Sequence, residues 1–146
     1  MTRFEEYERP AVTGDTVVIR DVAGRREVLL IRRGHEPFAG MWALPGGFLD
    51  PYEAPQDGAR RELTEETGLA WDGPLACIGG FGKRGRDPRG WTVSVVYLAV
   101  LDDPDVAVAG GDDAAEAAWH PLDDPPQLAF DHGEILDAAR EMLAGG

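Results

Sequence analysis

The chain has 146 residues, a formal net charge of −13 and one cysteine, and 43% of its residues are apolar. This composition is typical of a globular domain, and we expect one domain over residues 1–146. The acidity excludes the basic surface that long nucleic acids require, and with no run of about 18 apolar residues we expect neither a membrane span nor a signal peptide.

The only cysteine, Cys77, lies in an apolar run and cannot form an internal disulfide. We expect a buried structural thiol at this position, because free cysteines pack like small apolar residues. A cytoplasmic location follows as the expectation.

The first third of the chain contains apolar runs that predict β-strands, separated by turn residues. Residues 1–10 are polar and are expected to form an edge strand or a loose arm, with Phe4 and Tyr7 as anchors. The predicted order then is a strand over 11–20, a hairpin loop over 21–26, a strand over 27–33, a loop over 34–40 and a short strand over 41–44.

A helix is predicted from Pro55 to about Thr67. Proline fits the first turn of a helix, where its missing N–H costs nothing, and Gly68 supplies the stop. Ala59 and Leu63 are expected to form the buried stripe of this helix.

The second half of the chain repeats the pattern of strands followed by a helix. Strands are predicted over 75–81 and 91–101, with a charged loop over 83–90 between them, and a short strand is favoured over a helix at 114–120. The segment from Asp131 to Glu134 reads as a capping box that opens a helix ending before Gly145. The apolar side of this helix is expected to comprise Ile135, Leu136, Ala139, Met142 and Leu143. This order of elements predicts a mixed sheet covered by helices on both faces.

Three glutamates crowd one turn of the first predicted helix: Glu62, Glu65 and Glu66. The helical period places Glu62 on the same face as the other two, and each like-charge pair at that spacing costs roughly 0.2–0.5 kcal/mol. A divalent cation would make the cluster a binding site, because Mg²⁺ prefers carboxylate and phosphate oxygens. The alternative is an acidic, solvated helix face.

The pattern around this cluster resembles the Nudix box, the signature of hydrolases that split nucleoside diphosphates linked to another moiety. The matching positions are Gly47, Glu53, Arg61, Glu62, Leu63, Glu65, Glu66, Gly68 and Leu69. The resemblance implies an α/β fold, an α/β/α sandwich with a mixed β-sheet between helices. It also implies that Glu62, Glu65 and Glu66, with the carbonyl of Gly46, bind Mg²⁺ or Mn²⁺, and that Glu53 and Arg61 form a supporting ion pair.

Two regions of the chain offer candidates for the general base of the reaction. Many members of the family use an acidic residue from a loop well past the box, and Glu116 is the first candidate here, ahead of Asp112 and Asp113. Glu65 is the competing candidate within the box. For the acidic loop, a solvated surface is an equally good interpretation.

Substrate contacts rest on several weaker features. Arg32, Arg33 and His35 could hold phosphate or ribose, because arginine binds such groups bidentately, although a solvated loop is the alternative. Phe38, Trp42 and Trp91 could stack on a base, although core packing is more common.

The segments around Arg86, Arg89 and His132 resemble the ADP-ribose pyrophosphatase group and repressors built on the same domain. Gly85 replaces a proline that marks many of those pyrophosphatases, and His132 also fits a packing role.

The resemblance therefore implies a metal-dependent hydrolase that converts ADP-ribose to AMP and ribose 5-phosphate. The alternatives are an oxidised nucleoside triphosphate, a nucleotide sugar or a dinucleotide as substrate, or a module that senses ADP-ribose without turnover. A repressor is not expected, because the chain is acidic, keeps every box glutamate and shows no winged-helix segment before Gly146. Relatives often pair, so a homodimer is among the states that the resemblance allows.

Overall fold

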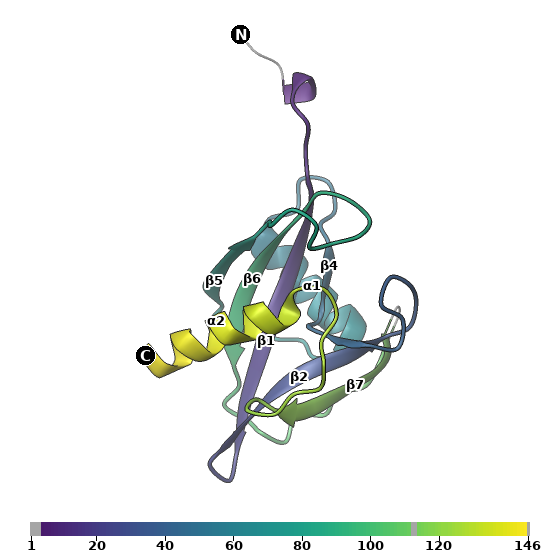
Figure 1. Ribbon diagram of the computed structural model, residues 1–146. Helices are drawn as coiled ribbons and strands as arrows, with labels where there is room; N and C mark the ends of the chain where they lie inside the picture. Colours follow the sequence, from purple (N-terminus) through teal and green to yellow (C-terminus); the bar gives the residue numbers. More distant parts are fainter. Residues whose placement is uncertain (1–3, 112–113, 146) are drawn as a thin grey trace.

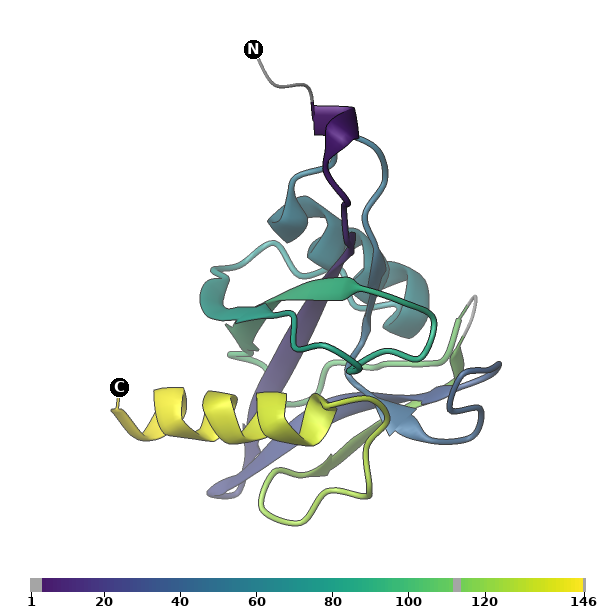
Figure 2. The same ribbon diagram turned by 45° about the horizontal axis from the view of Figure 1, so that its top comes forward.

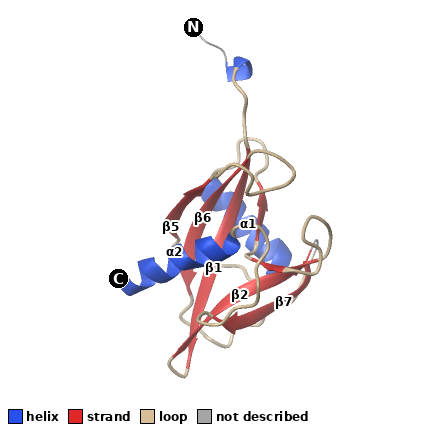
Figure 3. Cartoon of the chain, viewed as in Figure 1, coloured by secondary structure: helices blue, strands red, loops and turns tan. Residues whose placement is uncertain are grey.

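The structure is a computed structural model that describes residues 4–111 and 114–145. In this part of the chain a seven-stranded mixed sheet lies between two helices, α1 (Pro55–Thr67) and α2 (His132–Gly145) (Figures 1 and 2). The other elements are η1 (Phe4–Glu6), β1 (Ala11–Val22), β2 (Arg25–Arg33), β3 (Trp42–Ala43), β4 (Gly46–Phe48), β5 (Ala76–Phe81), β6 (Thr92–Val100) and β7 (Ala114–Pro121) (Figure 3).

Strand β1 is the centre of the sheet. It pairs in parallel with β6 from Ala11 opposite Thr92 to Ile19 opposite Val100, and antiparallel with β2 and β4. Strand β2 also pairs with β3 and β7, and β6 pairs with β5, which forms the opposite edge of the sheet. The expected mixed sheet is therefore confirmed.

Both faces of the sheet are covered because successive side chains of a strand point to opposite sides. Val17 and Ile19 of β1 pack with Ile135 of α2, whereas Val18 of β1 packs with Leu63 of α1. The two helices thus lie over opposite faces, and the predicted α/β/α sandwich is confirmed.

Helix α1 begins and ends as the sequence predicts. Pro55 occupies its first turn, after an extended Ala54 whose side chain makes no capping hydrogen bond. Gly68 adopts a left-handed conformation with φ 76°, and its N–H bonds the carbonyl of Thr64. Helix α1, which bears Glu62, Glu65 and Glu66, therefore has a defined start and end. The burial of Leu63 against the sheet fixes which face of the helix points inward.

Helix α1 packs closely on strand β1 at Gly14. A Cβ at Gly14 would lie 2.7 Å from the carbonyl oxygen of Pro55 and 2.8 Å from the nitrogen of Ala59, both backbone atoms of α1. The sheet and the helix can reach this separation because glycine has no side chain.

Replacing Gly14 by alanine is therefore expected to lower the free energy of unfolding by about 1–3 kcal/mol, since backbone must move to admit the methyl group. Urea denaturation measures the change. Gly80→Ala is the matched control, because a Cβ at this strand glycine meets nothing within 4 Å. Equal stabilities of the two variants would contradict the close packing of α1 on β1.

Three expectations are wrong at the periphery. Cys77 is exposed, because β5 is the edge strand and bulges between Cys77 and Gly79. Phe4 and Tyr7 are 77% and 60% exposed, so they do not anchor the N-terminal arm, which projects away from the sheet (Figures 1 and 2). Met142, expected on the apolar side of the last helix, is 38% exposed. Within residues 4–111 and 114–145, neither helix has the length and apolarity needed to cross a lipid bilayer.

Candidate active site

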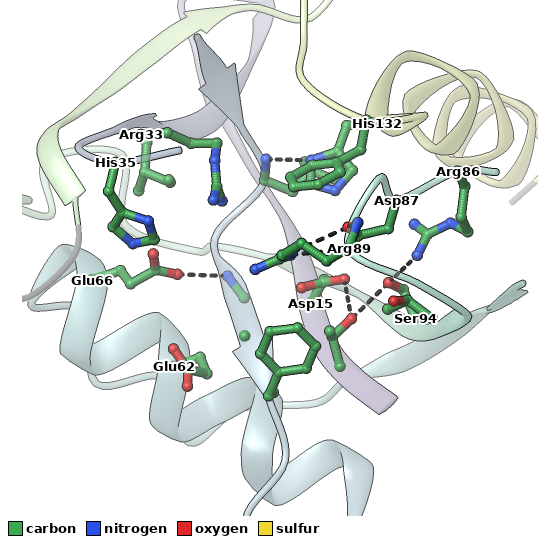
Figure 4. Close-up of a pocket in the computed structure, with 18 residues that line it drawn as sticks. Asp15, Arg33, His35, Glu62, Glu66, Arg86, Asp87, Arg89, Ser94 and His132 are labelled. Carbon is green, nitrogen blue, oxygen red and sulfur yellow. Dashed lines mark hydrogen bonds and ion pairs between the residues drawn. The ribbon is translucent and has the colours of Figure 1, made fainter. Parts of the chain in front are cut away.

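A pocket of about 240 Å³ opens where the glutamate face of α1 meets β1, β4 and the start of α2 (Figure 4). Its walls combine acidic, basic and aromatic side chains from segments far apart in the sequence. The residues that matter here are Thr13, Asp15, Arg33, His35, Gly46, Gly47, Phe48, Glu62, Glu66, Arg86, Asp87, Arg89, Ser94, Phe130 and His132.

Glu66 is the most enclosed of the three clustered glutamates, with 6% of its surface exposed. The N–H of Gly46 donates to Oε1 of Glu66 at 2.7 Å, which holds the carboxylate against β4. Burial raises the pKa of Glu66 to about 8, and the nearby charges of Glu62 and Asp15 act in the same direction, against the Gly46 hydrogen bond. This carboxyl group therefore lies where a cation would favour its ionised form.

The glycine pair at the start of the box lets the backbone approach these carboxylates. A Cβ at Gly46 would overlap the carboxylate of Asp15, and a Cβ at Gly47 would lie 2.5 Å from Cδ of Glu62. Only glycine fits at both positions, so β4 forms a floor across which Asp15 and Glu62 face the same pocket.

Asp15 is a site residue that the sequence analysis missed. It lies in β1, is 5% exposed, and accepts a hydrogen bond from Oγ1 of Thr13 at 2.9 Å. Burial raises its pKa to about 7, opposed by Thr13, Ser94 and Arg86, while Glu62 adds to the increase. The available signal was an aspartate within an apolar strand, where a charged side chain is rarely buried without a purpose.

The raised pKa values of Asp15 and Glu66 predict how stability depends on pH without metal. Their ordinary values are 3.8 and 4.5, so the folded protein keeps protons that the unfolded chain has lost. This contribution is full below the unfolded pKa values and is lost as pH rises through about 7 and 8.

We therefore expect the Tm of the metal-free protein to fall as the pH rises from about 6.5 to 9. The range begins at about 6.5 because His132 of the unfolded chain gains a proton below that pH and would add a pH dependence of its own. Calorimetric unfolding across this range measures the effect. Asp15→Asn has no proton to lose at this position, so its Tm should depend less on pH. A Tm that rises or stays constant would mean that both acids are ionised throughout.

Arg61 lies among the remaining acidic residues of the box. Its Nε and Nη2 bond Glu53 at 2.9 Å each, and its Nη1 bonds Glu62 at 2.9 Å and Glu65 at 3.1 Å. The two bonds from Arg61 to Glu53, helped by the N–H of Asp50, lower the pKa of Glu53 to about 2. Arg61 thus relieves part of the crowding that we attributed to a metal ion. In the described part of the chain, no group of three or more His, Cys, Asp or Glu side chains is arranged to hold an ion.

The structure places Glu116 and Arg32 outside the pocket. They form an ion pair at 3.4 Å between β7 and β2, and both side chains are about half exposed, 49% and 47%. Arg32 points away from its neighbours Ile31 and Arg33, which line the pocket, because strand side chains alternate. Glu65 also lies outside the pocket lining, and Asp112 and Asp113 fall outside the described residues.

Arg33 and Arg89 line the pocket together with two aromatic rings that we did not single out, Phe48 and Phe130. The guanidinium of Arg89 lies 4.8 Å from the ring of Phe48 and 5.6 Å from that of Phe130, and Arg33 lies 5.0 Å from Phe130. Arg89 is also paired with the buried Asp87 at 2.8 Å. This wall combines cations with flat apolar surfaces.

Other aromatic candidates do not reach the pocket. Phe38 packs edge-on against Phe130 at 4.8 Å and so supports the wall from behind. Trp42 packs against His120 at 4.4 Å, and Trp91 is 53% exposed on the surface. Core packing, the alternative given above, describes Trp42.

Arg86 reaches the pocket but is held by the protein. Its Nε and Nη2 donate to the two carboxylate oxygens of Asp131 at 2.9 and 2.7 Å, and its Nη1 donates to Ser94 at 2.8 Å. The predicted capping box is therefore wrong in its contacts: the N–H of Glu134 bonds the carbonyl of Asp131, while the carboxylate of Asp131 binds Arg86.

A sequence model of the NUDIX domain matches residues 11–139 of the chain. The chain belongs to the NUDIX family. This assignment confirms the resemblance identified on the box residues, and with the relatives below it makes the chain a Nudix hydrolase by family.

Two curated relatives resemble this Nudix chain over nearly its whole length. An ADP-ribose pyrophosphatase of Methanocaldococcus jannaschii is 38% identical over 93% of the chain and 76% of the relative. The ADPR responsive transcriptional repressor NtrR of Acinetobacter baylyi is 35% identical over 94% of the chain, but the chain spans only 56% of that protein.

Two solved structures share the Nudix fold of the chain. The NUDIX domain of Shewanella oneidensis NrtR, complexed with ADP ribose, has a TM-score of 0.86 and 31% identity, covering 97% of this chain and 94% of that one. A bifunctional NMN adenylyltransferase/ADP ribose pyrophosphatase from Francisella tularensis, complexed with AMP and a manganese ion, has a TM-score of 0.81 and 29% identity, covering 93% and 42%.

Proposed function

We propose that this Nudix chain hydrolyses the pyrophosphate bond of ADP-ribose to AMP and ribose 5-phosphate with the help of Mg²⁺ or Mn²⁺. The observation that carries the proposal is one pocket with buried carboxylates on one wall and arginines with aromatic rings on the other. An acidic wall suits cations, and the opposite wall suits phosphates and a base. The relatives that act on or bind ADP-ribose support the choice of substrate.

The metal ligands in this proposal are Glu62, Glu65, Glu66 and the carbonyl of Gly46. All four donors are oxygens, which suits a hard cation, and a cation would supply the counter-charge that the buried carboxyl group of Glu66 lacks. Since the described carboxylates are not gathered around one point and Glu65 lies outside the pocket lining, binding requires the glutamate side chains to turn toward the ion. When bound, a divalent ion neutralises phosphate charge and promotes ionisation of the attacking water. Glu53 and Arg61 position the cluster from the side of the loop.

The other proposed contacts follow from the pocket walls. Arg33 and Arg89 bind phosphate oxygens, as does Arg86 through the N–H groups that Asp131 and Ser94 leave available. Phe38 supports the ring of Phe130, against which a base can stack. Glu65 or Glu116 removes the proton from the attacking water; from its observed position, Glu116, like Arg32, must move to reach the substrate.

A substrate panel tests the proposal. ADP-ribose, an oxidised nucleoside triphosphate, a nucleotide sugar and a dinucleotide are incubated with Mg²⁺ or Mn²⁺, and the nucleoside monophosphate formed is measured by ion-exchange chromatography. We expect ADP-ribose to be cleaved with the highest kcat/KM, and no cleavage when EDTA removes the metal. Inert ADP-ribose alongside cleaved triphosphate would overturn the choice of substrate.

The second candidate is a module that binds ADP-ribose without turnover. It is favoured by the 35% identity to a repressor described as ADPR responsive. Calorimetry separates the candidates, because a sensor binds ADP-ribose and leaves it intact in the presence of Mg²⁺. The acidic charge of this chain argues against DNA as its partner.

Three further properties belong to the proposal. We infer one Nudix domain over residues 1–146 and a cytoplasmic location, because the exposed thiol of Cys77 suits a reducing compartment. A homodimer is proposed from the resemblance, and sedimentation of the purified protein measures it. The substrate is a small nucleotide and involves neither long nucleic acid nor a membrane.

A further inference from the structure

His132 has one ring nitrogen committed to the fold. The N–H of Leu44 donates to Nδ1 of His132 at 3.0 Å. A nitrogen that accepts a hydrogen bond carries a lone pair, so the neutral imidazole must carry its proton on Nε2. Across residues 4–111 and 114–145, no hydrogen bond to Nε2 of His132 is formed.

The free N–H of this ring faces the pocket. His132 is only 6% exposed, yet it lines the same pocket as Glu62 and Glu66. Nε2 forms no hydrogen bond, yet it is not among the described side-chain atoms that are both buried and unpaired, so it contacts solvent. Because His132 lines the pocket, we infer that this solvent is in the pocket. In Figure 4 the ring lies across the pocket from both glutamates.

The donor on Nε2 is uncharged. Burial lowers the pKa of His132 to about 4, and the nearby arginines Arg86 and Arg33 act in the same direction, against the charge of Asp131. The ring therefore stays neutral at the pH of ordinary activity. The negative charge of phosphate oxygens is matched by Arg33 and Arg89, which line the same pocket. The uncharged N–H of His132 adds no charge, so it suits an uncharged acceptor such as a sugar oxygen.

We propose that Nε2–H of His132 donates a hydrogen bond to a ribose oxygen of the bound substrate and so helps to select nucleotides with a ribose next to the phosphates. The inference rests on the proposed hydrolysis of a nucleoside diphosphate derivative. It assigns to His132 two separate tasks, one on each ring nitrogen, and the two can be removed separately.

Two substitutions of His132 separate the tasks. Asparagine places its side-chain oxygen near the position of Nδ1, so His132→Asn keeps an acceptor for Leu44 and loses the donor. Glutamine extends its amide nitrogen to the position of Nε2, so His132→Gln keeps the donor and loses the acceptor. We expect KM for ADP-ribose to rise about tenfold in His132→Asn, the size of one hydrogen bond, with an unchanged Tm.

For His132→Gln we expect the reverse, a Tm lower by about 2–8 °C with KM within about twofold of the wild type. Dissociation constants from calorimetry with ADP-ribose give the same comparison without turnover. Inhibition by inorganic pyrophosphate, which has phosphates but no ribose, should be equal in the wild type and His132→Asn.

An unchanged KM and Kd in His132→Asn would overturn the inference and leave His132 with a packing role. Equal weakening of pyrophosphate inhibition would overturn the ribose assignment. If His132→Asn does not fold, a raised KM in His132→Gln counts against the donor. Failure of the proposed function would be detected separately, in the substrate panel, as a wild-type protein that leaves ADP-ribose intact. The KM values of the wild type and the His132 variants are then compared with the nucleotide from the panel that is cleaved.

Discussion

Replacing Glu66 by glutamine is expected to lower kcat/KM by about 10³-fold or more without unfolding the protein. Glutamine has the same shape and can still accept the Gly46 hydrogen bond, but it cannot become a carboxylate in the pocket. If Glu66 binds the catalytic cation, its loss removes charge stabilisation that acts mainly in the transition state. Initial rates with saturating and limiting ADP-ribose measure the change.

The matched control is Glu141→Gln, the same chemical change on the exposed surface of α2. It should keep wild-type rates, and Glu66→Gln should also show weaker Mg²⁺ binding by calorimetry. A Glu66→Gln enzyme with normal turnover would exclude the carboxylate from the metal site. No turnover in either protein or in the wild type would favour the sensor candidate.

The largest expected effect on stability comes from Arg86→Gln. The side chain of Arg86 is 4% exposed, and its Nε and Nη2 both donate to the carboxylate of Asp131, whose side chain is 14% exposed. Removing one partner of such a pair leaves the other charge buried and unpaired, so we expect a loss of about 2–4 kcal/mol, or a Tm lower by about 5–12 °C. Thermal unfolding of the purified variant measures it.

A double-mutant cycle with Asp131→Asn checks that the loss comes from this pair. The double variant should be less destabilised than the sum of the two single changes, because the carboxylate no longer needs a partner. Additive losses would show that Arg86 stabilises the fold through Ser94 and packing instead. An unchanged Tm with a raised KM would make Arg86 a substrate ligand alone.

Local rules were sufficient for the elements that carry the box. The proline at the start of α1, the glycine after it and the apolar spacing of Ala59 and Leu63 act within a few residues, so the helix and its rotation follow from the sequence. The apolar runs of β1, β2 and β6 likewise match the two faces that α1 and α2 cover. The hairpin loop predicted over 21–26 is wrong in its bounds, because β1 extends to Val22 and β2 begins at Arg25, and β4 at Gly46–Phe48 was not predicted, since its glycines give no strand signal.

Errors arose where exposure depends on the position of a strand in the sheet. The apolar run around Cys77 would be buried in a central strand, but β5 is an edge, so the thiol reaches solvent. Arg32 and Arg33 are neighbours in the sequence with similar chemistry, yet only Arg33 faces the pocket. The direction of each side chain follows from the register of β2 with β3 and β7.

By itself, the sequence determined the family, the acidic turn of α1 and the order of the elements apart from β4, because these depend on short-range spacing. Only the tertiary structure decided that Asp15, Phe48, Phe130 and His132 share a pocket with Glu66. The parallel pairing of β1 with β6 and the docking of α2 bring together residues more than a hundred positions apart. No local spacing rule contains this information, since it arises from the packing of two helices on opposite faces of one sheet.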